Sequence, residues 1–70
     1  MRVTAVVLPL RKEEDVELGP HATGLDLVEA LRLAPDAHIL VRGDVPIPLD
    51  EPLVDGERLR ILSVVSGGAP

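Results

Sequence analysis

Residues 58–68 read RLRILSVVSGG, an alternating apolar segment that passes directly into two glycines. Successive side chains of a strand point to opposite faces, and aliphatic residues in alternation favour strands, so we predict a strand over residues 58–65. In this strand Leu59 and Ile61 share one face and are expected to pack into the core. The residues beyond 65 have no side chain able to anchor them, which predicts a mobile tail after the last strand.

The rest of the chain shows further strand patterns and one helical pattern. Thr23 and Asp26 have the three-residue spacing of a capping box, which places the start of a helix before an apolar-periodic stretch. Pro35 cannot continue a helix, so the helix is expected to end near residue 33. In order, we predict a strand over residues 2–8, a turn over 11–15, a strand over 16–18, a helix over 24–33, a strand over 38–42, a short edge strand over 45–49 and the last strand over 58–65. This order predicts an α+β domain with a mixed sheet of four to five strands and one helix across it.

Alternation also assigns side chains to the two faces of the predicted sheet. In the strand over residues 38–42, Ile39 and Val41 are expected to face inward, which leaves Leu40 outward. Leu62 and Val64 also point away from the predicted core, so with Leu40 they form a candidate partner-binding patch. Scattered surface aliphatics account for the same pattern equally well. The predicted core consists of Val3, Ala5, Val7, Leu27, Val28, Leu31, Ile39, Val41, Leu59 and Ile61.

Composition limits the class of protein. At 70 residues the chain forms one small domain, and the absence of Phe, Tyr and Trp makes its core aliphatic. The chain has no cysteine, which excludes disulfides, thiolate nucleophiles and cysteine-based metal sites. A formal net charge of -5 disfavours binding to nucleic-acid phosphates and favours docking onto a basic surface. No apolar run is long enough to span a membrane, so we expect a soluble cytoplasmic protein.

Few other residues suggest chemistry. His21 and His38 are the only imidazoles and lie in separate segments, so no metal site is predicted. Lys12 is the only lysine and falls in the predicted turn over residues 11–15. It is an ordinary surface charge or, if the protein is a modifier, a candidate acceptor for conjugation of a second copy.

The whole pattern resembles the β-grasp fold of ubiquitin-like proteins, and in particular the prokaryotic carriers of that family. These are the thiamine sulfur carrier, the small subunit of molybdopterin synthase and the archaeal small modifiers. The resemblance rests on four segments taken in order: TGLDLV at residues 23–28, VRGD at 41–44, LVDGERL at 53–59 and SGG at 66–68. It implies a domain over residues 1–65 and a Gly-Gly tail over residues 66–70. One departure is that Ala69 and Pro70 follow the second glycine, which is the C-terminus of mature family members, so the resemblance is to a precursor.

The resemblance implies a chemistry for the tail. In this family a partner enzyme uses ATP to join the terminal glycine carboxylate to AMP, and a sulfur species or, in modifiers, a thiol and then a lysine amine attacks the acyl-adenylate. Gly67 and Gly68 are thus the implied activated C-terminus. Glycines suit the step because without Cβ atoms they can thread a narrow channel and bring the backbone close to a nucleotide. Gly68 is in amide linkage to Ala69, so cleavage between them is expected first, and a JAMM-type metalloprotease is the implied partner for it.

Three functions remain open at this point. The first is a sulfur carrier whose Gly68 thiocarboxylate donates sulfur to a biosynthetic enzyme, and the second is a ubiquitin-like modifier joined to lysines of other proteins. Both require a ubiquitin-activating-type adenylating enzyme as partner, so the sequence does not separate them. The third is a plain β-grasp binding domain in which the tail has no role. In none of the three is the chain an enzyme or the holder of a cofactor, since the partner enzyme uses the ATP.

Overall fold

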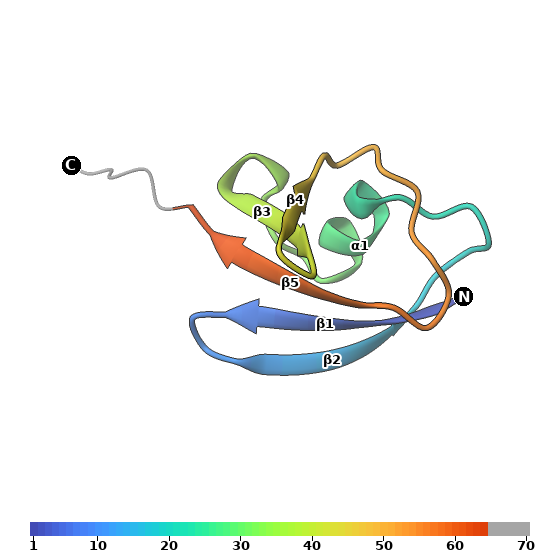
Figure 1. The fold of residues 1–70 in the computed structure, drawn as a ribbon, viewed down its shortest axis with the longest axis horizontal. Coiled ribbons are helices and arrows are strands. Elements are labelled where there is room, and N and C mark those ends of the chain that lie inside the picture. Colours follow the sequence, from blue (N-terminus) through green and yellow to red (C-terminus); the bar gives the residue numbers. More distant parts are fainter. Residues whose placement is uncertain (65–70) are drawn as a thin grey trace.

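A computed structural model of the 70-residue chain describes residues 1–64. The predicted tail over residues 66–70 lies outside the described residues, and with it the predicted sites at Gly67, Gly68 and Ala69. The described elements are β1 (Arg2–Leu8), β2 (Lys12–Glu17), α1 (Gly24–Ala30), a 3₁₀ turn (Pro35–Ala37), β3 (His38–Arg42), β4 (Val45–Ile47) and β5 (Arg58–Ser63). Figure 1 shows the five strands as one sheet with α1 packed across one of its faces.

The sheet is mixed, with the strand order β2-β1-β5-β3-β4. Its centre is the parallel pair β1 and β5, in which Ala5 lies beside Leu59 and Val7 beside Ile61. β2 and β3 lie antiparallel on either side of this pair, and β4 is antiparallel to β3 at the far edge. Parallel strands cannot be joined by a tight turn, so the chain between β1 and β5 makes a long excursion that includes α1. This is the α+β, β-grasp arrangement that the sequence pattern predicts.

The hydrophobic core lies between α1 and the sheet. Leu27 and Val28 of α1 are completely buried in one cluster with side chains of the central strands, among them Leu59 and Ile61. Burial of one such side chain contributes about 1.5–3 kcal/mol, so this layer is the main source of stability in a domain without aromatic residues. The cluster consists of Val3, Ala5, Leu27, Val28, Leu40, Leu53, Leu59 and Ile61. Six of these are predicted core residues, whereas Val7, also predicted, is half-buried at its border.

α1 begins close to the sheet because Gly24 has no side chain. A Cβ atom at this position would collide with the side chain of Leu40 and would lie 3.2 Å from the carbonyl oxygen of Leu49. The predicted capping pair is present, since the backbone N–H of Thr23 donates to the Asp26 carboxylate at 2.8 Å. The start of the helix is therefore set both by a cap and by the tight approach of its first turn to β3.

α1 is shorter at its C-terminal end than predicted, because it stops at Ala30. Arg32 has a φ of 61°, which is left-handed, and the N–H of Leu33 donates to the carbonyl oxygen of Val28 at 3.0 Å. These are the features of a Schellman cap, which ends a helix by satisfying its last carbonyl groups. Leu31 stands at this cap and is only half-buried, so its placement in the core is correct only in part.

The hairpin of β1 and β2 also differs from its predicted form. The predicted turn over residues 11–15 is wrong: the turn consists of residues 9–11, and β2 runs from Lys12 to Glu17. An edge strand tolerates a run of charged side chains because much of its surface stays in solvent. Val16 lies opposite Val3 and packs against the core, which is what fixes β2 in place. Lys12 therefore belongs to a strand and not to a turn.

The two faces of β3 are the reverse of the predicted assignment. Leu40 is 1% exposed, on the face that α1 covers, so its prediction as an outward partner-binding residue is wrong. Ile39 is 41% exposed, so its placement in the core is also wrong. The physical reason is the tight β3–β4 connection, which pairs Leu40 with Ile47 and turns both toward the core. Val41 is buried as predicted, but by alternation it shares the open face with Ile39.

Candidate functional site

Exposed aliphatic side chains lie on the sheet face opposite α1, near the end of β5. Leu62 lies between Leu8 of β1 and Ile39 of β3, and all three face away from the core because an adjacent residue in each strand faces into it. Leu62 is 36% exposed and Val64, two residues later, is 42% exposed. Leu8, Ile39, Leu62 and Val64 are named the open-face patch below.

The chain leaves the sheet beside this patch. β5 ends at Ser63, and the N–H of Val64 then donates to the carbonyl oxygen of Ala37 at 2.8 Å. This bond holds Val64 beside Ala37, the last residue of the 3₁₀ turn. The predicted activated terminus, Gly67 and Gly68, follows only three residues later in the sequence and lies outside the described residues.

Charged side chains border the patch. Arg60 lies between Val6 of β1 and Val41 of β3, and both valines are 8% exposed although no helix covers them. The guanidinium of Arg60 donates to the carbonyl oxygen of Gly43 and lies 3.5 Å from the Asp44 carboxylate. Arginine stems can cover apolar surface while their charged heads stay in water. The open face thus has an apolar part and a charged border, the usual anatomy of a docking surface.

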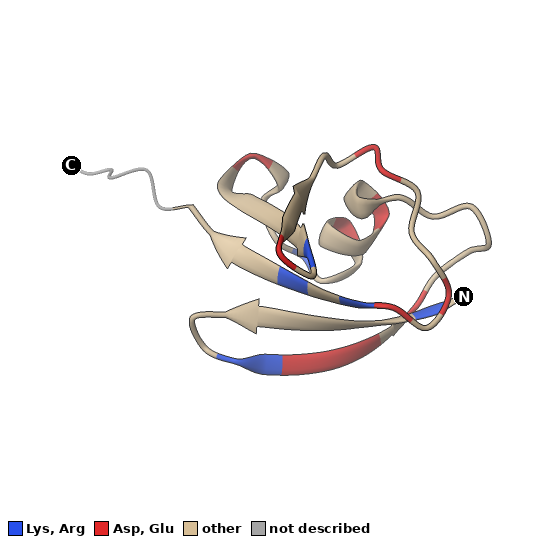
Figure 2. Ribbon diagram, viewed as in Figure 1, with Lys and Arg blue, Asp and Glu red and all other residues tan. Residues whose placement is uncertain are grey.

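The other border of the face is acidic. Figure 2 shows acidic residues along β2 and basic residues on β5. Arg58 of β5 pairs with Glu13 at 2.6 Å, and Arg2 of β1 pairs with Glu17 at 3.1 Å. Both pairs are more than half exposed, so each contributes at most about 1 kcal/mol to folding. Their main effect is on the charge pattern of this part of the surface.

Lys12, the candidate acceptor for conjugation, belongs to β2, a strand that begins at the same end of the sheet at which β5 ends (Figure 1). It is the first residue of β2 and pairs with Val7, which itself lies beside Ile61 of β5. Its side chain is 66% exposed, and its ammonium lies 3.3 Å from the Glu14 carboxylate. The amine is therefore accessible from solvent.

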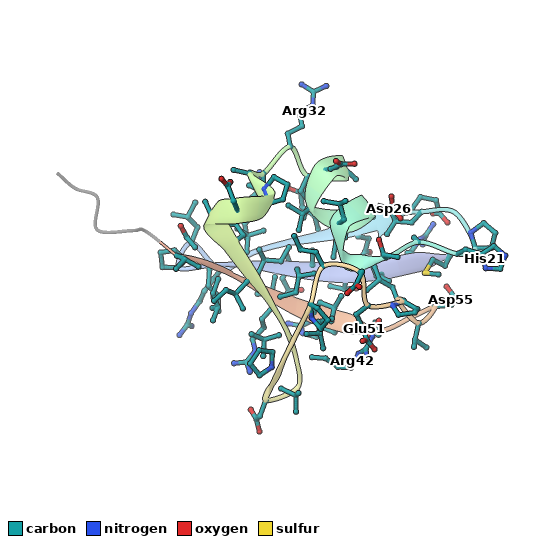
Figure 3. The ribbon with its side chains drawn as sticks, turned by 90° about the horizontal axis from the view of Figure 1, so that it is seen from above. His21, Asp26, Arg32, Arg42, Glu51 and Asp55 are labelled. Atoms are coloured by element: carbon teal, nitrogen blue, oxygen red, sulfur yellow. The ribbon has the colours of Figure 1, made fainter. Side chains whose placement is uncertain are left out.

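A cluster of ion pairs closes the loop between β4 and β5. Arg42 of β3 donates to Glu57 at 2.8 Å and to Glu51 at 3.0 Å, and Figure 3 shows Arg42 and Glu51 on neighbouring segments. Partial burial pushes the pKa of Glu57 up, but hydrogen bonds from Arg42 and from the N–H of Val54 outweigh it and hold this pKa below its ordinary value. The same two carboxylates raise the pKa of Arg42. The cluster positions the loop whose Glu51 carbonyl oxygen accepts the N–H of Gly24 at 3.1 Å, so its role is structural.

Within residues 1–64 the structure holds no enclosed pocket and no group of His, Asp or Glu side chains placed to hold a metal ion. No helix in this part of the chain is long and apolar enough to cross a membrane.

The structure brings together only part of the predicted patch. Leu62 and Val64 are both exposed, as alternation along β5 predicts, and Ile39 stands where Leu40 was expected. Leu8 is an addition, since only the parallel register with β5 shows that it lies beside Leu62. One signal could have corrected the assignment of β3: a two-residue turn at residues 43–44 pairs residue 40 with residue 47, an isoleucine suited to the core. The role of these residues in partner binding stays a prediction.

Comparison with other sequences identifies relatives. No protein-family model matches the chain. Over 63 residues it is 32% identical to the sulfur carrier protein TtuB of Thermus thermophilus, a match that covers 90% of this chain and 97% of TtuB. Over 58 residues it is 28% identical to an uncharacterized protein of Archaeoglobus fulgidus, covering 83% of this chain and 84% of that one.

Comparison with solved structures supports the fold. Ubiquitin of Caldiarchaeum subterraneum matches with a TM-score of 0.72 at 19% identity, covering 97% of this chain and 98% of that one. A ubiquitin-like protein of the same archaeon matches with a TM-score of 0.60 at 18% identity, covering 96% and 100%. At such identities the likeness shows the fold alone, which is the ubiquitin-like β-grasp. The match to TtuB is closer in sequence and spans nearly all of both chains, and on that ground the protein belongs to the family of ubiquitin-like β-grasp sulfur carriers.

Proposed function

We propose that this protein is a sulfur carrier whose residue Gly68 becomes the activated terminus after Ala69 and Pro70 are removed. The observation that carries the proposal is the similarity to TtuB, which spans 97% of that sulfur carrier and not a fragment of it. The Gly-Gly pair that follows the last strand supplies the residue type that terminal activation requires.

The chemistry proceeds in two steps, both on a partner enzyme. A carboxylate oxygen of Gly68 attacks the α-phosphorus of ATP, pyrophosphate leaves, and an acyl-adenylate forms. Hydrosulfide from a sulfur donor then attacks the acyl carbon, AMP leaves, and a thiocarboxylate remains that can donate sulfur to a biosynthetic enzyme. In this chemistry the carrier contributes the acyl group and the partner enzyme the catalysis, so we assign the carrier the role of a substrate protein and not of an enzyme.

The partner of the first step is an adenylating enzyme of the ubiquitin-activating type, and the open-face patch is its docking surface. The patch combines exposed aliphatic side chains with a charged border, and it lies where the chain leaves β5. An enzyme that covers Ile39 and Leu62 would therefore receive the tail from a fixed point. A few side chains near the centre of an interface contribute most of its binding energy. We place this encounter in the cytoplasm, where ATP is available.

The two residues after Gly68 make the chain a precursor in this proposal. An amide carbonyl has no free carboxylate oxygen to attack ATP, and Gly68 is joined to Ala69 by an amide. The proline ring fixes φ near about −65° and removes a backbone donor, so it does not mimic glycine in a narrow channel. A JAMM-type metalloprotease that cleaves between Gly68 and Ala69 is the partner assigned to this step.

ATP–pyrophosphate exchange with the adenylating enzyme tests the proposal on three chains: the full-length protein, a chain ending at Gly68, and the same shortened chain with Gly68→Ala. We expect exchange only with the unsubstituted chain that ends at Gly68. The full-length protein has no free carboxylate on Gly68, and in the Gly68→Ala chain the added Cβ atom would meet the wall of the channel. Intact mass should then show one oxygen replaced by sulfur. High-mass conjugates without this exchange of atoms would favour a protein modifier, and no change with the true partner would favour a plain binding domain.

A further inference from the structure

The two edge strands of the sheet differ in how open their outer edges are. β4 is three residues long and contains Pro46, which has no backbone N–H to donate. β2, at the opposite edge, has six residues and no proline. Short strands and prolines are common means of protecting a sheet edge, and β2 has neither. It is therefore the edge at which a further strand can pair.

The hydrogen bonds between β1 and β2 show which backbone groups of β2 point outward. The N-terminal amine of Met1 donates to the carbonyl oxygen of Leu18 at 2.7 Å, and the N–H of Leu18 donates back to Met1 at 2.7 Å. In an antiparallel pair, residues that exchange both bonds alternate with residues that exchange none. By the register of the pair, Glu13, Asp15 and Glu17 belong to the second kind, so their N–H and C=O groups point away from β1.

The other side of β1 confirms this assignment. Thr4 lies opposite Asp15, and its N–H donates at 2.9 Å to the carbonyl oxygen of Glu57, the residue before β5. Thr4 thus directs its backbone away from β2, as the alternation requires. Within residues 1–64 no hydrogen bond reaches the outward N–H and C=O groups of Glu13, Asp15 and Glu17. These groups have the spacing that a neighbouring strand needs.

The side chains of the same three residues lie on the open face of the sheet. Val16, between two of them, packs against the core, so Asp15 and Glu17 point to the opposite face, and Glu13 with them. Glu13 and Glu17 have arginine partners but remain more than half exposed. Asp15, at the centre, is exposed and accepts a hydrogen bond from the Thr4 hydroxyl at 2.9 Å, and no cation of the described residues pairs with it. The backbone groups of the edge are the binding groups, and the carboxylates select among strands.

We propose that the outer edge of β2 binds an extended segment of a partner protein in which basic and aliphatic residues alternate. The segment adds a sixth strand, antiparallel to β2, whose basic side chains lie opposite Glu13, Asp15 and Glu17. Its aliphatic side chains turn to the other face, beside the half-buried Val16. Opposite charges and aliphatic pairs across neighbouring strands both stabilise a sheet. This surface goes beyond the proposed function, since Leu62 of the open-face patch lies on β5, two strands away.

A second copy of this chain does not fit the same edge. Antiparallel pairing of two β2 strands about their centres would place Asp15 opposite its counterpart and Glu13 opposite Glu17. Like charges directly opposite one another destabilise a sheet. The carboxylates therefore keep copies apart and favour a basic partner, and the formal net charge of -5 adds to the attraction.

The probe for this site is a capped peptide of alternating arginine and valine, added to the full 70-residue chain. Amide hydrogen exchange measured residue by residue by NMR reports the pairing. We expect exchange to slow at least about tenfold at the N–H groups of Glu13, Asp15 and Glu17, because they become hydrogen-bonded. Exchange at Glu14 and Val16 should change little, since their N–H groups already face β1. A control peptide N-methylated at its arginines keeps the charge but lacks the donors that face β2, and it should not slow exchange.

Two variants with the same change of charge test the side-chain selection. Asp15→Lys reverses the central charge of the edge and should weaken peptide binding about tenfold. Asp44→Lys, in the turn before β4 at the other edge, should weaken it far less. Equal losses in the two variants would overturn the proposal.

Three further results would also overturn it. They are peptide binding without slower exchange at the three edge amides, equal binding of the N-methylated peptide, and equal binding of a peptide with glutamate in place of arginine. Slower exchange at these amides with rising protein concentration and no peptide would instead assign the edge to a second copy. The assay contains no adenylating enzyme and no ATP, so its outcome is independent of the proposed function.

Discussion

Both faces of the sheet carry aliphatic side chains, but only one of them is covered. Under α1, Leu40, Leu59 and Ile61 are at most 1% exposed, whereas on the open face Ile39 and Leu62 are 41% and 36% exposed. These residues are of the same type and alternate along the same two strands. The difference lies in what covers them, so aliphatic composition alone does not distinguish a core from a docking surface. We infer that the covered face provides stability and the open face is available to a partner.

The largest difference in unfolding free energy should be that between two truncations at adjacent residues of β3 that face opposite sides of the sheet. Leu40→Ala empties a completely enclosed site and should cost about 2–5 kcal/mol of unfolding free energy. Ile39→Ala removes a side chain already in contact with water and should cost less than about 1 kcal/mol, mostly through lower strand propensity. Urea denaturation measures both. Equal costs, or a larger cost at position 39, would show that the faces of β3 are assigned the wrong way round.

This pair also shows where sequence reasoning succeeds and where it fails. β1 and β5 could be predicted because their alternation is regular, and the start of α1 because Thr23 and Asp26 mark it. β3 contains three consecutive aliphatic residues, so either alternation satisfies the pattern, and only its pairing with β4 decides between them. Only the end of β2 was predicted, as part of a strand over residues 16–18, because the carboxylates before it obscure a strand that Val16 anchors.

The candidate site divides in the same manner. The proposed chemistry of Gly67 and Gly68 depends on residue type and on position after the last strand, so the sequence is enough to propose it. The open-face patch depends on which residues of three strands lie side by side, and Leu8 joins Leu62 only through a parallel pairing between distant segments. Patterns within one strand carry no information about such pairings.

The second largest effect should come from the ion cluster that closes the covered face. Glu57→Gln should cost about 1–2 kcal/mol at neutral pH, because Arg42 and the Val54 N–H lose a charged acceptor while Arg42 remains one-third exposed. Since the pKa of Glu57 is lower in the folded protein than its ordinary value of 4.5, its contribution is complete above that pH and disappears as the pH falls through the folded pKa. The difference in unfolding free energy between the parent and Glu57→Gln should therefore become smaller in acid.

Denaturation curves measured from neutral pH down to strongly acidic pH test this dependence. The matched control is Glu17→Gln, which removes a carboxylate from the exposed pair with Arg2 and should change stability little at any pH. A Glu57→Gln difference that stays constant or grows in acid would contradict the inferred direction of the pKa shift.

On the open face we expect a smaller change, and it concerns the free energy of partner binding and not that of unfolding. Leu62→Asp puts a charge at the centre of the open-face patch and should weaken binding to the adenylating enzyme at least about tenfold, which corresponds to about 1.4 kcal/mol. The fold should survive because Leu62 is already in contact with water. Val54→Asp is the control, since Val54 is 59% exposed but lies in the loop before β5. Equal binding by both variants would exclude the patch as the docking surface, and an unfolded Leu62→Asp protein would show that the two faces are not separable.

The smallest effect concerns the end of the helix that covers the core. Arg32 adopts a left-handed φ of 61°, which is strained for a residue with a Cβ atom, and its side chain points away from the body of the molecule (Figure 3). Arg32→Gly should therefore stabilise the protein by about 0.5–1 kcal/mol, the relief of strain being partly offset by the greater freedom of glycine in the unfolded chain. Gly43 offers the opposite test, because it also has a left-handed φ of 62° and a Cβ added to it would meet open space. Gly43→Ala should therefore destabilise the protein by a similar amount. Thermal and urea unfolding measure both changes. If Arg32→Gly lowered stability, the Arg32 side chain would have to help hold α1 against the sheet. The packing of α1 on the core would then depend on more than its buried residues Leu27 and Val28.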